Sequence, residues 1–299
     1  MKPHNKITPM TSTLLEGIHS DLIGPIKPIS IDSMKYILTF IDEFSRKSWI
    51  YLLKEKSETV NTILYFLKYV ENHHGNKIKF FKSDNAREYN NSKIKKYFRK
   101  LGIKKIFSTP YNPENNGIAE RFNQTLMNSV KTLIYWSKLS KDFWSFASIY
   151  ANHLYNITPR KSISNLIPNE IFYNTKVDIT PIKVFGCIAY YNNLQNKKSK
   201  IDINSKEGIF LGIKFDTHCY IIMDKTDQKF HLVRKAIFKE DTPGLHIYKY
   251  PEFFNSNNIT INSTNNLNSS DNNINKEEGN IDINCINPTS NKSNNNNEI

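Results

Sequence analysis

The order of apolar segments in residues 17–178 limits the fold of this chain more than any other feature. Three short strand-like runs come first, over residues 18–23, 36–41 and 49–53. Apolar residues at helical spacing then predict an amphipathic helix over residues 58–71, and residues 78–81 are predicted to form a fourth strand that leads straight into Asp84. This order indicates an α/β fold.

A second helix with one strongly basic face follows. Asn91 or Ser92 is its expected N-cap, and Gly102 supplies the stop. Opposite its apolar stripe, the helix carries five basic residues: Lys93, Lys95, Lys96, Arg99 and Lys100. Such a face is either simply solvated or in contact with phosphate groups.

A fifth strand and two longer helices complete this first zone. We expect the strand at residues 104–107 and the helices at residues 117–136 and 142–156. Three strands, a helix, a strand, a helix, a strand and further helices predict a mixed five-stranded sheet covered by helices.

Two further zones differ in character. Residues 184–240 hold short apolar runs at residues 184–191, 208–213, 220–224 and 230–238, which predicts a small antiparallel β domain. Residues 251–299 contain 18 asparagines and little apolar content, so we expect a disordered tail.

The basic charge of the chain is concentrated before this tail. Residues 1–250 hold 39 basic and 22 acidic residues, whereas residues 251–299 hold two and six. So basic a folded region favours a polyanionic partner, with nucleic acid the usual one. A lysine-rich solubility bias is the alternative.

Membrane and secreted classes are disfavoured. No window approaches the roughly 18 apolar residues that span a bilayer, and the polar residues 1–13 do not form a signal peptide. The three cysteines, Cys187, Cys219 and Cys285, are far apart and odd in number. They argue against a disulfide framework and for a reducing, intracellular compartment.

Three acidic residues occupy special places in this predicted fold. Asp21 lies in the first strand, Asp84 ends the fourth strand, and Glu120 lies in the first turn of a long helix. A carboxylate buried at a strand end is costly unless it is paired or binds a metal. Mg²⁺ prefers oxygen ligands, and two such ions about 4 Å apart can clamp a phosphodiester.

Each of these acids also has an ordinary structural explanation. Asp21 could start a turn before Gly24, Asp84 could form an Asx turn, and Glu120 could stabilise a helix N-terminus. Taken together, however, the three positions favour a metal-binding triad.

The segments around these acids resemble a known family. The words G-I-H-S-D-L-I-G-P (17–25), K-S-D-N-A-R-E-Y (82–89) and N-N-G-I-A-E-R-F-N-Q-T-L (115–126) are similar to the signature blocks of copia-type (Pseudoviridae) retrotransposon integrases. Phe143-Trp144, Pro168-Asn169-Glu170 and 184–187 also lie where such polyproteins carry similar words, and residues 208–212 resemble the SH3-like β domain that follows the core.

The resemblance implies a fold and a triad. It implies an RNase H-like catalytic core over residues 17–178, an SH3-like domain over 184–240, and Asp21, Asp84 and Glu120 as ligands of Mg²⁺, with Mn²⁺ as a substitute. Residues 1–16 are then a lead-in after a missing zinc module, because no cysteine accompanies His4 there. The chain would be a fragment of a Gag-Pol polyprotein.

The implied activity is DNA integration. An integrase trims the 3′ end of the element DNA and then joins the exposed 3′-hydroxyl to a target phosphodiester. Double-stranded DNA, a homo-multimer and a nuclear site of action after a cytoplasmic particle stage belong to the same implication, with no membrane involved. The alternatives are a catalytically inactive DNA-binding remnant and another RNase H-fold nuclease.

Several other residues are candidates for DNA contact. By helical spacing Asn123, Gln124 and Lys131 lie on or near the side of Glu120. Gln124 and Lys131 are the candidates for DNA contact, and a solvated face is the alternative for both. The remaining candidates are Asn116, Lys95 and Arg99. One departure from the family pattern is Ala86, where glycine is usual, and a positive φ there would cost about 1 kcal/mol. No zinc site is expected.

Overall fold

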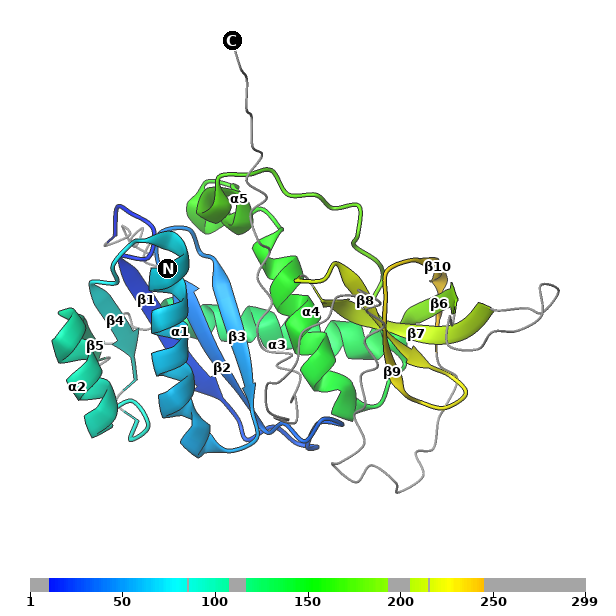
Figure 1. Ribbon diagram of the computed structural model, residues 1–299, viewed down its shortest axis with the longest axis horizontal. Coiled ribbons are helices and arrows are strands. Elements are labelled where there is room, and N and C mark those ends of the chain that lie inside the picture. Colours follow the sequence, from blue (N-terminus) through cyan, green and yellow to red (C-terminus); the bar gives the residue numbers. More distant parts are fainter. Residues whose placement is uncertain (1–10, 85, 108–116, 193–204, 215, 245–299) are drawn as a thin grey trace, which may run out of the picture. The chain divides into compact units, whose positions relative to one another are not determined.

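The computed structural model describes residues 11–84, 86–107, 117–192, 205–214 and 216–244 (Figure 1). The chain divides into two compact units: the first unit comprises Met1–Tyr135 and Ser140–Ile182, and the second comprises Trp136–Leu139 and Lys183–Ile299. The asparagine-rich residues 251–299, for which we predicted disorder, lie outside the described residues.

The first unit is built on a mixed sheet. Its strands are β1 (Gly17–Ile23), β2 (Tyr36–Asp42), β3 (Ser48–Leu53), β4 (Phe80–Ser83) and β5 (Lys104–Phe107), in the order β3-β2-β1-β4-β5. β1, β2 and β3 pair antiparallel, whereas β1 pairs with β4 and β4 with β5 in parallel. The predicted RNase H-like mixed five-stranded sheet is confirmed.

One strand boundary differs from the prediction. β4 begins at Phe80 and not at Ile78, because the β1–β4 ladder starts at Gly17 opposite Phe80. Ile78 is buried in the core, so its apolar character predicted a strand that the hydrogen-bond ladder does not include. Residues 11–16, expected as a lead-in, also contribute to the core, since Leu15 is fully buried.

The helices of the first unit largely follow their sequence signals. They are η1 (Lys56–Glu58), α1 (Thr59–His74), α2 (Ser92–Leu101), α3 (Gly117–Ser137), η3 (Lys141–Phe143), α4 (Trp144–Asn156), η4 (Lys161–Ile163) and α5 (Pro168–Tyr173). The last two residues of α3, after Tyr135, are assigned to the second unit. α1 runs three residues past the predicted end, up to Gly75 with φ 69°. Within the described ranges, no helix combines the length and apolar content needed to span a bilayer.

Helices cover both faces of this sheet. On one face Ile18, Leu38 and Phe40 pack with Ile63 and Phe66 of α1. On the other face α3 and α4 reach the strands through polar contacts, which join Asn123 to Asp21 and Asn156 to Ser48. Figure 1 accordingly shows α1 in front of the strands and α3 passing behind them. The polar contacts on the second face position the candidate site.

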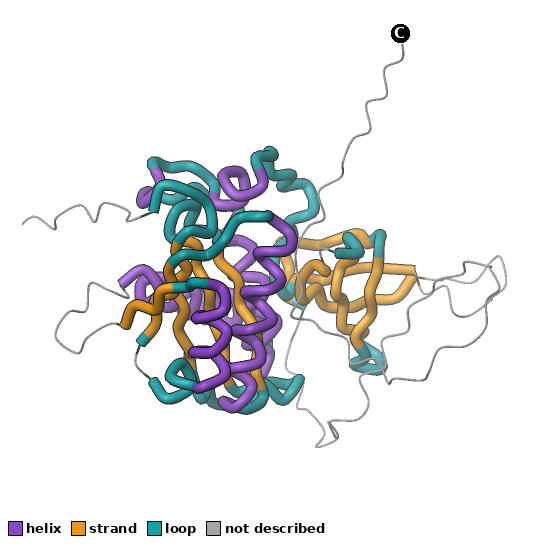
Figure 2. Tube along the Cα trace, turned by 60° about the vertical axis from the view of Figure 1, so that its left-hand side comes forward, coloured by secondary structure: helices purple, strands orange, loops and turns teal. Residues whose placement is uncertain are grey.

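The second unit is a small antiparallel sheet, drawn as a separate group of strands in Figure 2. It contains β6 (Cys187–Asn192), β7 (Ser205–Lys214), β8 (Cys219–Asp224), β9 (Phe230–Val233) and β10 (Ala236–Pro243), in the order β10-β6-β7-β8-β9. The predicted antiparallel β domain is confirmed.

Two details of the second unit correct the sequence prediction. The run predicted at residues 230–238 is two strands, because β9 pairs with β8 while β10 crosses to pair with β6 at the opposite edge. Residues 184–186 precede β6 and do not belong to it, and Gly186 there has a φ of 77°.

Candidate active site

Asp21, the first carboxylate of the predicted triad, is held in place by hydrogen bonds from a side chain and from the backbone. Its Oδ2 accepts a hydrogen bond from Asn123 Nδ2 at 2.8 Å, and its Oδ1 accepts one from the Leu22 N–H at 2.8 Å. Thr39, its partner on β2, places Oγ1 3.1 Å from both the Asp21 carbonyl oxygen and Asn123 Oδ1. Side chains of β2 and α3 therefore fix the orientation of this carboxylate.

The charges of the other two predicted triad residues, Asp84 and Glu120, act on the carboxylate of Asp21. Burial raises the pKa of Asp21, and the negative charges of Asp84 and Glu120 raise it further, against the hydrogen bonds from Leu22 and Asn123. Like charges act in this way only when they lie near one another. Carboxylates from β1, from the end of β4 and from the start of α3 thus share one electrostatic environment.

Asp84 directly follows β4, and Glu120 lies in the first turn of α3. Burial raises the pKa of Asp84, as does the nearby charge of Glu88, whereas Lys56 and Lys105 lower it. Asp84 Oδ1 accepts a hydrogen bond from the Ala86 N–H at 3.2 Å. Glu120 is exposed. Asp84 is thus partly fixed by its own loop, while Glu120 faces solvent.

The donor set of the triad fits divalent cations. Carboxylate oxygens are the ligands that Mg²⁺ and Mn²⁺ prefer, and the mutual repulsion felt at Asp21 is what a bound cation would relieve. In the described ranges the three carboxylates do not form a group whose ligand atoms all lie within 4.8 Å of one another. Two cations that share the triad do not require that spacing.

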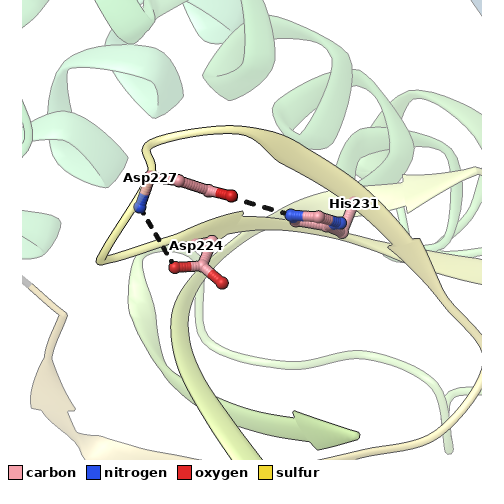
Figure 3. Close-up of side chains that lie close together, drawn as sticks. All are labelled: Asp224, Asp227 and His231. Carbon is pink, nitrogen blue, oxygen red and sulfur yellow. Dashed lines mark hydrogen bonds and ion pairs between the residues drawn. The ribbon is translucent and has the colours of Figure 1, made fainter. Parts of the chain in front are cut away.

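A closer group of this kind lies in the second unit. Asp224, Asp227 and His231 place one ligand atom each within 4.8 Å of the others (Figure 3). However, Asp224 Oδ2 already accepts hydrogen bonds from Tyr191 Oη at 2.6 Å and Lys206 Nζ at 2.9 Å. This oxygen of Asp224 is therefore already paired with a lysine ammonium.

The role of Asp224 is to close the β8–β9 hairpin. Its Oδ1 accepts from the Thr226 N–H at 2.7 Å within the connecting turn. Burial by itself would raise the pKa of Asp224, but the hydrogen bonds from Tyr191 and Lys206 outweigh burial and lower the pKa to about 2. This is the behaviour of a structural ion pair.

Several contacts at the site were not predicted from the sequence. Asn123 and Thr39 hold Asp21, and Glu88 adds a fourth carboxylate near Asp84, where it pairs with Lys56 at 3.1 Å. Tyr89 Oη lies 3.0 Å from Ser20 Oγ. Burial raises the pKa of Tyr89 well above its usual value, and Asp21 and Asp84 raise it further. Helical spacing placed Asn123 on or near the side of Glu120, but its hydrogen bond to Asp21 was not predicted.

The predicted DNA contacts are exposed wherever the structure describes them. Gln124 and Lys131 are exposed on α3, and Lys95 and Arg99 are exposed on α2. Asn116 lies outside the described residues. Exposure leaves these four side chains free to meet a ligand, and their role remains a prediction.

The φ angle of Ala86 depends on Asn85, which lies outside the described residues, so the backbone cost considered for Ala86 stays a prediction.

Comparisons with known proteins find family matches in both units of the chain. Residues 15–113 match the integrase core domain family, and residues 187–248 match the retroviral polymerase SH3-like domain family. The catalytic core domain of BIV integrase is similar with a TM-score of 0.40 and 19% identity, covering 54% of this chain and 95% of that one.

Curated relatives extend the match across both domains. The chain is 34% identical over 227 residues to the retrovirus-related Pol polyprotein from transposon TNT 1-94 of Nicotiana tabacum, which covers 76% of this chain and 17% of the polyprotein. It is 29% identical over 240 residues to that from transposon RE1 of Arabidopsis thaliana, with 80% and 16% covered. The chain thus spans a small part of these relatives. The chain thus carries an integrase core domain followed by a retroviral SH3-like domain, and its homologues include copia-type, retrovirus-related Pol polyproteins.

Proposed function

We propose that this chain is the catalytic part of a retrotransposon integrase that processes the 3′ ends of element DNA and joins them to target DNA. Hydrolysis of a phosphodiester first frees a 3′-hydroxyl. That hydroxyl then attacks a target phosphodiester, forms a new P–O bond and releases the target 3′-oxygen. Neither step requires a covalent enzyme intermediate.

One observation carries this proposal. The carboxylate of Asp21, which Asn123 holds by a hydrogen bond, has its pKa raised by the negative charges of Asp84 and Glu120. Carboxylates from three distant segments of the chain therefore interact. Such a charge cluster is costly for folding, and phosphoryl transfer assisted by divalent cations is a function that uses it.

In the proposed mechanism the chain's own residues mainly position charge. Asp21, Asp84 and Glu120 would hold Mg²⁺, or Mn²⁺ in its place. When bound, the cations supply charge neutralisation for phosphoryl transfer. Asn123 keeps the Asp21 carboxylate oriented toward the shared site, and Thr39 fixes Asn123 in turn.

The proposed substrate is double-stranded DNA, bound chiefly through its backbone. Exposed Lys95 and Arg99 on α2, with Gln124 and Lys131 on α3, are the proposed contacts. Backbone contacts carry little base information, so we expect weak target-sequence preference. Because two element ends must be joined to one target, we propose that the active form is a homo-multimer. We also propose that it acts in the nucleus.

A strand-transfer assay tests the proposal. The full chain is incubated with a labelled DNA end, a plasmid target and Mg²⁺ or Mn²⁺, beside its Glu120→Gln variant. We expect metal-dependent joining that Glu120→Gln reduces by at least about 100-fold, since this substitution removes a charge but little volume. Asp216→Asn, an exposed carboxylate of the second unit, should join like the wild type.

The outcomes separate the rival functions. Metal-dependent cutting without joining would instead identify another nuclease of this fold. DNA binding with neither cutting nor joining would indicate an inactive DNA-binding remnant. Joining that survives Glu120→Gln would contradict the assigned triad.

A further inference from the structure

A buried charged row lies beside the Asp21–Asp84 pair. His19 and Lys82 are partners in the parallel β1–β4 register, and each stands two residues before one of these carboxylates. Side chains two residues apart along a strand lie on the same face. His19 therefore lies on the same face of the sheet as Asp21, and its partner Lys82 lies on that face of β4, which ends one residue before Asp84.

Glu43, the residue after β2, joins this row. Its Oε2 accepts a hydrogen bond from Lys82 Nζ at 2.8 Å and lies 3.2 Å from His19 Nε2. The side chains of His19, Glu43 and Lys82 are 2%, 3% and 10% exposed. The ammonium of Lys82 is thus withdrawn from water and directed toward Glu43.

The ammonium of Lys82 is a competitor of divalent cations for the triad carboxylates if it loses its partner Glu43. A lysine stem is long and flexible, and a buried ammonium without a partner is strongly disfavoured. We expect this ammonium, when released from Glu43, to turn toward Asp21, on the same face of the sheet, and toward Asp84, which directly follows β4. Burial and the negative charges of Asp84 and Glu120 raise the pKa of Asp21, so a positive charge near this carboxylate would be favoured. An internal ion pair there would compete with divalent cations.

We propose that Glu43 is a positioning residue that holds the Lys82 ammonium away from Asp21 and Asp84 and so keeps their oxygens available for divalent cations. This inference rests on the proposed function. It assigns to Glu43 an electrostatic role in addition to the mechanical one of joining β1, β2 and β4.

Direct Mn²⁺ binding to the full chain tests the inference without any assay of catalysis. Glu43→Gln keeps the shape of the side chain but removes the charge that attracts Lys82. We expect Glu43→Gln to weaken Mn²⁺ binding in isothermal titration calorimetry by about tenfold or more, the usual effect of losing a residue that supports metal ligands. Circular dichroism and thermal melting confirm that the variant is folded.

The decisive variant is Glu43→Gln/Lys82→Met. It removes the released ammonium, so we expect it to regain most of the wild-type affinity for Mn²⁺. A purely mechanical role for Glu43 predicts the reverse, because the second substitution would disturb the strands further. A double variant that binds Mn²⁺ as weakly as Glu43→Gln would overturn the inference.

Three further variants complete the design. Lys82→Met alone should bind Mn²⁺ at least as well as the wild type, and weaker binding would also overturn the inference, even if Glu43→Gln does not fold. Glu55→Gln breaks an ion pair with Lys35 (2.5 Å) in which Glu55 is well exposed, and should leave Mn²⁺ binding unchanged. Asp21→Asn should abolish it.

The failure of the inference is distinguishable from that of the proposed function. A wild-type chain that shows no Asp21-dependent Mn²⁺ binding would contradict both. Asp21-dependent binding that Glu43→Gln leaves intact would contradict only the role of Glu43.

Discussion

Asn123 links helix α3 to the carboxylate of Asp21, and this single contact lets the site be tested one side chain at a time. Asn123→Ala removes the hydrogen bond to Asp21 Oδ2 and leaves Thr39 without its α3 partner. We expect strand transfer to fall by about 10- to 100-fold, as for other residues that orient metal ligands. Unfolding in urea should show a loss of only about 1 kcal/mol, typical for one hydrogen bond.

The matched control is Asn128→Ala, on the exposed side of the same helix. It should leave both strand transfer and stability near the wild-type values. Equal losses of activity in the two variants would show that α3 tolerates no change, and would remove the specific role assigned to Asn123.

Asp224 gives a prediction about pH. Its folded pKa of about 2 lies below the usual 3.8, so the folded state binds fewer protons than the unfolded state between these values. The stability that Asp224 contributes is therefore complete above about pH 4 and declines as the pH falls toward 2. Asp224→Asn should destabilise the second unit at pH 7, and the difference from wild type should shrink as the pH falls below about 4.

Urea unfolding at several pH values between 7 and 3 measures this effect. Asp216→Asn, at a more exposed ion pair with Lys214 (3.5 Å), should change stability much less at every pH. A difference between Asp224→Asn and wild type that does not vary with pH would contradict the ion pair as its source.

At the scale of elements, helix α2 carries its core residues and its proposed DNA contacts on different faces. Its buried side carries Ile94 and Phe98, whereas Lys95 and Arg99 are exposed. Lys95→Glu/Arg99→Glu should therefore fold normally but bind DNA more weakly. If both residues contact phosphates, the negative slope of log affinity against log salt concentration should become less steep by about two.

Fluorescence anisotropy with labelled duplex DNA over a salt series measures this slope. Lys68→Glu, an exposed position on α1, is the control and should alter the slope much less. Equal effects at α1 and α2 would indicate diffuse attraction by net charge, and the proposed α2 surface would then be wrong.

At the scale of the whole molecule, the two compact units should respond differently to metal. Asp21, Asp84 and Glu120 all belong to the first unit. Mn²⁺ at 100 times its dissociation constant should stabilise that unit by about 2.7 kcal/mol. Differential scanning calorimetry should show one transition that rises with Mn²⁺ and one that Asp224→Asn lowers. An equal Mn²⁺ shift in Asp21→Asn would contradict binding at the triad.

Local sequence signals predicted the elements whose causes are local. The Asn91 side chain accepts a hydrogen bond from the Lys93 N–H at 2.8 Å, and Gly102 ends α2 with a φ of 71°, as capping residues predict. β4 and the β9–β10 break were misplaced because their bounds depend on which distant strand they pair with. Apolar character marks burial, and it does not specify a hydrogen-bond partner.

The sequence by itself determined the element order, the two-domain arrangement of sheets and the three acids that are candidates for the site, since periodicity, caps and short motifs are local. Only the tertiary structure decided which side chains meet Asp21. Asn123 is 102 residues away from it, and Glu43 meets Lys82 across 39 residues. Such contacts depend on how strands pair and helices pack, because that packing decides which distant side chains share a face.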